Sequence, residues 1–230
     1  MNQEWRKMIN QYAIYDNFLD DPHSMVSSLR SQKYYFQGID DLNNDIKNNI
    51  PLEINYGDAS LVGDPRFDSP YWKGYRTRDL QEIDLDSYNV IMSKLLEKIF
   101  GTFTLSQLEF DAETHFHIMT KDFTFNETWY HSDSSKFIAG VLYLSENPAP
   151  NSGTTLIIND EKTSIENKFN RLIVYNASLV HSAQGCFGDS LENSRATFVF
   201  FIRNLSIYND AYDQKDDPMV NRVRNEIGGY

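Results

Sequence analysis

The sequence predicts an α+β fold that is mainly β. Short apolar segments separated by turn-forming residues fill the second half of the chain, from about residue 103 to residue 203. Two segments with apolar residues at helical spacing precede them. Many short strands joined by regular turns are typical of a β-sandwich or barrel. We therefore expect two or more N-terminal helices to pack on one outer face of a β core.

A single domain accounts for the whole chain. The 230 residues are enough to bury a core without disulfide bonds, and they contain no internal repeat or low-complexity tract. We expect one domain over 1–230. It consists of an N-terminal strand, helices and irregular loop over 1–101, a β core over 102–205 and a polar tail over 206–230.

The first expected elements are a strand and an amphipathic helix. Aromatic residues alternate with small or polar residues over 12–19, which favours a strand. Asp21 then precedes Pro22, which is typical of a helix with proline at its first position behind an acidic cap. Apolar residues follow at helical spacing, so we expect a helix over 22–33 with the side chain of His23 facing solvent.

The segment 37–82 is rich in Asn, Asp, Gly and Pro and is expected to be the least regular part of the chain. Within it, Tyr71–Arg78 combines aromatic and cationic side chains. This cluster is interpreted either as a substrate lid, in which Arg76 meets an anionic group, or as a cap on the barrel mouth. The second interpretation is favoured, since aromatic loops usually bury themselves. A second helix is expected over 86–100, ending at Gly101.

The second half of the chain is expected to form strands. Its apolar segments are short, and turn-forming runs such as Asn147–Gly153 and Gly185–Asp189 separate them. Seven strands are predicted, at 103–110, 113–119, 137–145, 153–158, 171–175, 179–183 and 195–203.

Composition limits the partners and the cellular setting. The net charge is −12, from 21 basic and 33 acidic residues, which argues against nucleic acid as the substrate because phosphate binding favours basic surfaces. No apolar run approaches the roughly 20 residues of a transmembrane helix, and the first residues lead into no apolar signal region. A lone Cys186 excludes an internal disulfide. We expect a cytoplasmic protein without a membrane partner; its oligomeric state is left open.

The motif His131-Ser132-Asp133 is a candidate metal site. On an extended segment, His-x-Asp places the imidazole and the carboxylate on the same face. The chain has five histidines, and the number of His-x-Asp tripeptides expected by chance is about 0.5. The tripeptide therefore indicates a metal site only together with the other candidate residues of the sequence. His181 lies in another apolar strand, where a buried structural histidine is the alternative. Two histidines and one carboxylate form the facial triad that binds non-haem Fe(II).

Arg195 is a candidate anchor for an organic acid. It opens the apolar strand 195–203, and it shares a strand face with Thr197. A guanidinium pairs with a carboxylate through two parallel hydrogen bonds, and the threonine hydroxyl could add a third. The alternative is an exposed arginine at a strand end. However, Arg195 begins a buried strand without an acidic neighbour in sequence, so it requires an anion.

His115 and His117 form a weaker candidate. They alternate on one face of a predicted strand, and this spacing could bind a metal. Such a pair is more often a half-exposed strand face. A metal role is therefore not expected, although both side chains could line the cavity.

The ordered set resembles the Fe(II)/2-oxoglutarate-dependent oxygenases. His-x-Asp is followed by Tyr143-Leu144, Ser152–Leu156, His181 and Arg195-Ala196-Thr197. The set is most similar to the prolyl-hydroxylase-like branch, and the opening Asp16–Pro22 is similar to that of small bacterial and phage members. The resemblance spans 12–36 and 110–203. It implies a double-stranded β-helix core, a jelly-roll or cupin-like fold.

The resemblance also implies the cofactor, the co-substrate and their residues. Fe(II) would be bound by His131, Asp133 and His181. The C5 carboxylate of 2-oxoglutarate would meet Arg195, Thr197 and the hydroxyl of Tyr143. Gly153 matches a small residue of the family, where a strand passes close to the site.

The implied function is that of a dioxygenase. It would hydroxylate an amino-acid residue of a protein or a small molecule with dioxygen, and release succinate and CO2. Collagen-type prolyl hydroxylases have a lysine at the anchor, so Arg195 puts the prolyl substrate in doubt but not the co-substrate. The alternative is a β-barrel module that binds a metal or an acidic ligand without turnover.

Overall fold

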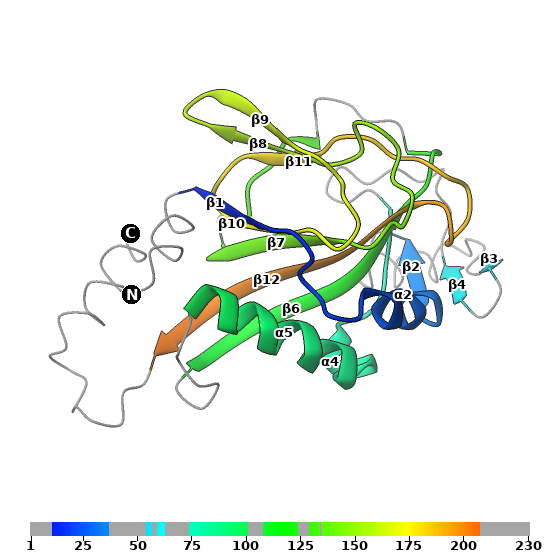
Figure 1. Cartoon of the computed structure of the whole chain (residues 1–230), viewed down its shortest axis with the longest axis horizontal. Helices are drawn as coiled ribbons and strands as arrows, with labels where there is room; N and C mark the ends of the chain where they lie inside the picture. Colours follow the sequence, from blue (N-terminus) through cyan, green and yellow to red (C-terminus); the bar gives the residue numbers. More distant parts are fainter. Residues whose placement is uncertain are drawn as a thin grey trace, which may run out of the picture.

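Figure 1 shows the chain as a computed structural model. The structure describes the residues in the ranges 11–36, 54–56, 59–62, 74–100, 108–123, 129–133 and 135–207. These residues form a nine-stranded sheet, a three-stranded sheet and a small number of helices. The prediction of a mainly β fold with helices is confirmed.

The large sheet is antiparallel except where β2 pairs with β4. Its long central strands pair over up to twelve positions, which makes them the rigid frame of the molecule. In spatial order the strands are β1 (Tyr12–Tyr15), β10 (Leu172–Asn176), β7 (Ile138–Tyr143), β12 (Arg195–Ile207), β6 (Leu108–Met119), β5 (Tyr75–Arg76), β2 (Lys33–Phe36), β4 (Ala59–Val62) and β3 (Ile54–Tyr56).

The small sheet lies over one end of the large sheet, on the side away from helix α5 (Figure 1). It consists of β11 (His181–Ala183), β8 (Thr154–Ile158) and β9 (Glu161–Ile165), in that spatial order. The strands β8 and β9 are joined by Asn159 and Asp160, whose φ angles of 51° and 65° are left-handed. Two such residues form the tight turn that matches the twist of a β-hairpin.

The helices α2 (Pro22–Arg30), α4 (Leu80–Ile83) and α5 (Leu85–Phe100) come from the first half of the chain. Asp21 caps α2, because its Oδ1 accepts a hydrogen bond of 3.1 Å from the backbone N–H of Ser24. The apolar stripe of α5 is buried in the same core cluster as Phe116 and Phe198 of the large sheet. The helices therefore cover the outer face of this sheet.

The strand β12 separates the two sides of the core. Its alternate side chains point to opposite faces, as the geometry of a strand requires. Phe198 and Phe200 belong to the cluster that includes the helices. Val199 and Phe201 belong to a second cluster, together with Leu156 of the small sheet. The space between the two sheets therefore has an apolar lining on the side of the large sheet.

The structure corrects several predicted boundaries. The predicted strands 103–110 and 113–119 are one strand where the structure describes them, because Leu108–Met119 pairs continuously with β12. Within the segment 37–82, the structure describes the short strands β3, β4 and β5, which were not predicted individually. The strands β2 and β9 were not predicted. The predicted tail lies outside the described residues beyond Ile207.

None of the helices in the described ranges is long and apolar enough to cross a membrane.

Candidate metal centre

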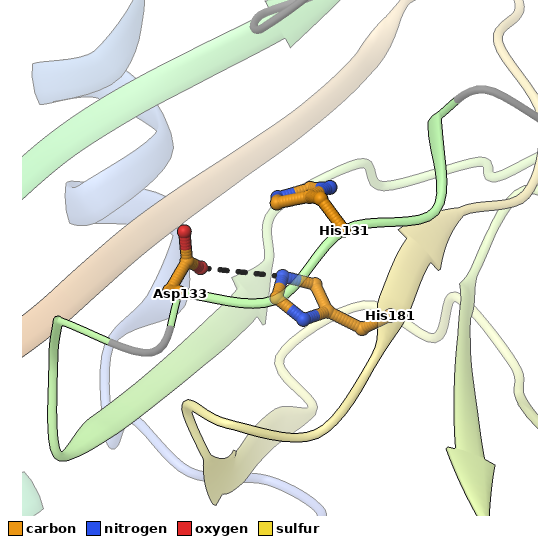
Figure 2. Close-up of side chains that lie close together, drawn as sticks. All are labelled: His131, Asp133 and His181. Carbon is orange, nitrogen blue, oxygen red and sulfur yellow. Dashed lines mark ion pairs between the residues drawn. The ribbon is translucent and has the colours of Figure 1, made fainter.

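Three predicted ligands lie together between the two sheets. His131 and Asp133 precede β7, and His181 is the first residue of β11. Their side chains point toward one another (Figure 2). One ligand atom from each residue lies within 4.8 Å of the others, with His181 buried and His131 at the exposed edge of the group. This compact set of two imidazoles and one carboxylate has the composition of a facial triad.

Backbone hydrogen bonds bring the ligands to the same place. The N–H of His131 donates to the carbonyl of His181 over 3.0 Å, and the N–H of His181 donates back over 2.8 Å. This reciprocal pair is an isolated antiparallel bridge. Directly opposed residues in such a pair present their side chains on the same face, and the two imidazole centroids are 4.4 Å apart. The N–H of Asp133 donates to the carbonyl of Ala177 over 2.8 Å, which holds the carboxylate beside them.

Backbone carbonyls also determine the tautomer of both imidazoles. The Nδ1 atom of His131 lies 2.8 Å from the carbonyl oxygen of Trp129. The Nδ1 atom of His181 lies 2.9 Å from the carbonyl oxygen of Leu179. A carbonyl oxygen only accepts, so in each neutral ring Nδ1 carries the hydrogen and Nε2 keeps its lone pair. Both imidazoles are therefore oriented as metal ligands.

The environment of the Asp133 carboxylate indicates that the cluster binds a cation. Its Oδ2 atom is buried and accepts no hydrogen bond from the described residues. It lies 3.4 Å from Nε2 of His181, so two lone-pair atoms face each other across a short gap. Such an arrangement is unfavourable unless a cation lies between the atoms or the imidazole is protonated. The donor set therefore fits a divalent metal ion.

The protein around the cluster disfavours a charged imidazole. Loss of water from around His131 lowers the pKa of this residue, and the neighbouring His181 lowers it further. A neutral imidazole is the form that binds a metal ion. The electrostatic environment and the hydrogen-bonding pattern thus both favour a neutral imidazole with a free lone pair on Nε2.

The cluster opens into a cavity of about 430 Å³ between the sheets. This volume is within the range of small-molecule sites. The described residues that line it include five apolar or aromatic side chains of the large sheet, Met119, Val141, Tyr175, Val199 and Phe201. They also include two arginines, Arg76 and Arg195. The cavity therefore combines apolar walls with a small number of charged groups.

Arg195 is almost completely buried, with 2% of its surface exposed. Its Nε donates to the carbonyl of Ser152 over 2.8 Å, and its Nη2 donates to the carbonyl of Gly153 over 3.3 Å. These bonds fix the plane of the guanidinium beside the cavity. A Cβ atom at residue 153 would overlap the carbonyl oxygen of Ile165, so only glycine permits this close approach of strands. Among the described residues, no acidic side chain forms an ion pair with Arg195.

Tyr143 and Thr197 lie behind the cavity wall. The hydroxyl of Tyr143 donates to Oγ1 of Thr154 over 2.8 Å, and the guanidinium carbon of Arg195 lies 5.8 Å from the centroid of the tyrosine ring. Burial raises the pKa of Tyr143, so its hydroxyl keeps its proton. The hydroxyl of Thr197 donates to the carbonyl of His117 over 3.3 Å. In the described structure, Thr154 rather than Tyr143 or Thr197 contributes directly to the wall.

Two residues of the cavity wall were not among the predicted site residues. Tyr175 packs against His181 with ring centroids 4.8 Å apart, and burial raises its pKa well above the ordinary value. Arg76 was placed only in a loop cluster, yet it is a buried strand residue of the wall. His117, which the sequence allowed but did not require to line the cavity, is part of the wall and pairs with Arg76 in the register of β5 and β6.

His115 has a different environment from His117. Its Nδ1 atom lies 2.9 Å from the carbonyl of Thr77, and its Nε2 atom lies 3.3 Å from Glu113. It is not part of the cavity wall that the described residues form. Residues 71–73 of the Tyr71–Arg78 cluster lie outside the described residues.

Comparison with known proteins places the fold. No family model matches the sequence, and no curated protein matches it. Among solved structures, a prolyl 4-hydroxylase from Pseudomonas putida superposes with a TM-score of 0.53 at 15% identity, covering 87% of this chain and 98% of that one. The non-heme α-ketoglutarate-dependent epimerase SnoN from nogalamycin biosynthesis gives 0.53 at 11% identity, with 94% and 89% covered. The chain has the fold of the 2-oxoglutarate/Fe(II) oxygenases.

A third structure supports this oxygenase fold. EvdO2 from Micromonospora carbonacea var. aurantiaca, solved as a complex with 2-oxoglutarate, superposes with a TM-score of 0.51 at 9% identity. The similarity covers 91% of this chain and 94% of that one. The predicted resemblance to a prolyl-hydroxylase-like oxygenase fold is therefore confirmed, and it extends over nearly the whole chain.

Proposed function

We propose that this protein is an Fe(II)- and 2-oxoglutarate-dependent dioxygenase. It would hydroxylate an amino-acid residue or a small molecule and release succinate and CO2. One observation carries the proposal: His131, Asp133 and His181 present three ligand atoms within 4.8 Å of one another, in the cavity that also contains the buried Arg195. A metal site alone would not require a buried cation beside it.

The fold supports the same proposal. We propose that the two sheets correspond to a double-stranded β-helix, the core that the sequence resemblance implies, with α2 and α5 packed on its outer face. The two sheets enclose the cavity, and residues of both line it. A site between two rigid sheets keeps its geometry better than a site on loops.

His131, Asp133 and His181 would hold the metal, and the buried carboxylate would offset part of its charge. Fe(II) bound there would supply the chemistry of dioxygen activation with 2-oxoglutarate as co-substrate. The carbonyls of Trp129 and Leu179 keep both Nε2 lone pairs directed at the metal position. The protein therefore presents a preformed ligand set.

Arg195 would bind the C5 carboxylate of 2-oxoglutarate. Its Nη1 atom has only a weak contact of 3.6 Å with the sulfur of Met119. Tyr143 and Thr197 would support this end of the co-substrate, with Tyr143 acting through Thr154. The apolar side chains Val141, Val199 and Phe201 would exclude water from the reacting groups.

An anaerobic titration tests the proposal. Addition of Fe(II) and 2-oxoglutarate should give a weak visible charge-transfer band, and admission of oxygen should give slow succinate formation without a substrate. His131→Ala and Asp133→Ala should abolish both signals, because each removes a metal ligand. His23→Ala is the matched control, since this histidine is exposed on α2.

Absence of both the band and the succinate in the parent protein would contradict the proposal. Metal content combined with oxygen consumption separates the alternatives. A β-barrel module that only binds would retain metal or 2-oxoglutarate but consume no oxygen above the level of the two ligand variants.

A further inference from the structure

Two backbone carbonyls hold the guanidinium of Arg195 along one edge. Its Nε and Nη2 atoms, which donate to Ser152 and Gly153, form the side edge of the planar group. The end edge consists of Nη1 and the second hydrogen of Nη2. Among the described residues, Nη1 makes a weak contact of 3.6 Å with the sulfur of Met119, a residue of the cavity wall. The carbonyls of residues 152 and 153 therefore determine which edge of Arg195 is presented to an anion in the cavity.

These two carbonyls belong to a connection and not to a strand. Ser152 and Gly153 lie between β7 and β8, immediately before the first residue of β8. The hydroxyl of Ser152 donates to the carbonyl of Ala149 over 2.6 Å, which closes the turn on one side. Groups on a connection hold a precise direction only where neighbouring residues lock them in place. The orientation of Arg195 thus depends on whatever supports this turn.

Asn167 supports the turn at Ser152. Its Nδ2 atom donates to Oγ of Ser152 over 3.2 Å and lies 3.5 Å from the carbonyl oxygen of the same residue. The asparagine comes from the connection between β9 and β10, and 4% of its surface is exposed. Its Oδ1 atom is buried and accepts no hydrogen bond from the described residues. A buried acceptor without a partner lowers stability, so stability alone does not explain an asparagine at this position.

Gln184 supports the turn at Gly153. Its backbone N–H donates to the carbonyl of Gly153 over 3.0 Å, and its Oε1 accepts from the N–H of Gly153 over 3.1 Å. Its Nε2 donates to the hydroxyl of Ser164 in β9. Gln184 directly follows β11, whose first residue is His181. The pairing of β11 with β8 therefore sets the spacing between the metal cluster and Arg195.

We propose that Asn167 and Gln184 are positioning residues that hold Arg195 with its end edge toward the cavity, and that they thereby make the site selective for a 2-oxo acid with a second carboxylate. This inference rests on the proposed function. The distal carboxylate would bind the end edge through two parallel hydrogen bonds. Loss of either support would release a carbonyl from its direction and let the guanidinium turn. The keto acid end, held at the metal cluster, would not be affected.

Comparison of 2-oxoglutarate with pyruvate tests the inference. Pyruvate has the same keto acid group but no distal carboxylate. Each acid is titrated anaerobically into the protein with Fe(II), and the charge-transfer band reports its binding. Asn167→Ala and Gln184→Ala should each raise the Kd of 2-oxoglutarate about 10-fold, the scale of a weakened hydrogen bond to a charged group. The Kd of pyruvate and the position of the band at saturation should not change, because the metal ligands remain in place.

Two further variants assign this effect to Arg195. In Arg195→Gln the two acids should bind with nearly equal affinity, and addition of Asn167→Ala to this variant should cause no further loss. Asn170→Gly is the matched control, because Asn170 is a buried asparagine of the same β9–β10 connection whose side chain bonds the backbone of Leu19. Glycine suits its φ of 61°. This control should lower stability but keep the parent ratio between the two acids.

Three results would overturn the inference. A ratio that stays at the parent value would remove the role of the substituted residue, and Gln184→Ala retains the test if Asn167→Ala does not fold. An equal loss of pyruvate binding would indicate general damage to the site. A loss that persists in the Arg195→Gln background would show that the effect does not pass through Arg195. The parent band separates these results from failure of the proposed function, since its absence would contradict the oxygenase assignment itself.

Discussion

At the scale of single residues, the site depends on backbone groups as much as on side chains. Both imidazoles are oriented in the same way, by the carbonyl two residues earlier in the chain, that of Trp129 for His131 and that of Leu179 for His181. An extended segment places this carbonyl next to Nδ1. The repeated pattern explains how two separate segments present Nε2 atoms to one point.

Tyr143→Phe tests the layer behind the cavity. The substitution removes a buried hydrogen bond of 2.8 Å to Thr154. The free energy of unfolding should fall by about 1 kcal/mol, the usual contribution of such a bond. Affinity for 2-oxoglutarate should also fall, because Thr154 lines the cavity. Urea denaturation and calorimetry measure the two effects. Tyr12→Phe on the half-exposed β1 is the control, and equal stability of both variants would contradict the prediction.

The ligands of the site could be predicted from the sequence, but their supporting groups could not. His131, Asp133 and His181 form a recognisable ordered set, and the structure brings them together. Backbone acceptors such as the carbonyl of Leu179 are present at every residue and carry no sequence signal. The orientation of the Arg76 side chain toward the cavity could not be predicted either, because a two-residue strand inside a polar segment shows no hydrophobic periodicity.

At the scale of elements, charged side chains tie the edge strand β1 to the sheet. Asp16 follows β1, and its carboxylate accepts hydrogen bonds from Arg171 over 2.6 and 3.1 Å. Lys168 donates to the same carboxylate over 2.8 Å. These bonds, first from Arg171 and then from Lys168, hold the pKa of Asp16 well below its ordinary value of 3.8. The cluster supplements a strand pairing of only four residues.

Asp16→Asn should lower stability in a pH-dependent way. The folded carboxylate binds a proton less readily than the unfolded one, so the ion pairs stabilise the protein fully above the ordinary pKa. This contribution is lost as the pH falls through the folded pKa. At neutral pH the variant should lose up to about 1 kcal/mol, the limit for a partly exposed pair. The difference should shrink below about pH 4.

Thermal unfolding at a series of pH values checks this prediction. Asp160→Asn is the control, because Asp160 is exposed in the β8–β9 turn and asparagine suits its φ of 65°. A difference between Asp16→Asn and the parent protein that stays constant down to low pH would show that the carboxylate charge is not responsible.

The elements differ in how clearly the sequence indicates them. The apolar strands β7, β10 and β12 were predicted close to their observed positions, because burial requires continuous apolar runs. The strand β9 was missed since its residues are mostly polar and its outer face is exposed. The Asn159-Asp160 pair was the available signal, because such residues readily adopt the left-handed turn of a hairpin.

At the scale of the whole molecule, the large sheet has two different faces. One face is covered by the helices, and the other forms the wall of the cavity. The same strands therefore stabilise the fold on one face and position the residues of the site on the other. Damage to the helical side should lower the stability of the complete domain rather than that of a local segment.

Leu95→Ala tests whether damage to the helical face of the large sheet destabilises the complete domain. Leu95 is fully buried in the core cluster that α5 shares with the sheet, with 0% of its surface exposed. Its truncation should cost about 2–5 kcal/mol of unfolding free energy, the range for large core deletions. Val90→Ala is the matched control on the same helix, because Val90 is 56% exposed. Its effect should stay within about 0.5 kcal/mol.

Chemical denaturation with two independent probes checks the prediction. Far-ultraviolet circular dichroism follows the helices, and tryptophan fluorescence includes Trp129 beside the cavity. Both probes should report one shifted transition in Leu95→Ala. Separate transitions would show that the helical layer and the cavity layer unfold independently.

The reciprocal backbone hydrogen bonds between His131 and His181 have a kinetic consequence. Neither residue can leave the pairing unless both bonds break, so the two segments open and close together. An ion held between the imidazoles would be released by this shared opening, and its residence time would follow the opening rate. The same motion exposes both amide hydrogens to water, so the two hydrogens should share one opening free energy in hydrogen exchange.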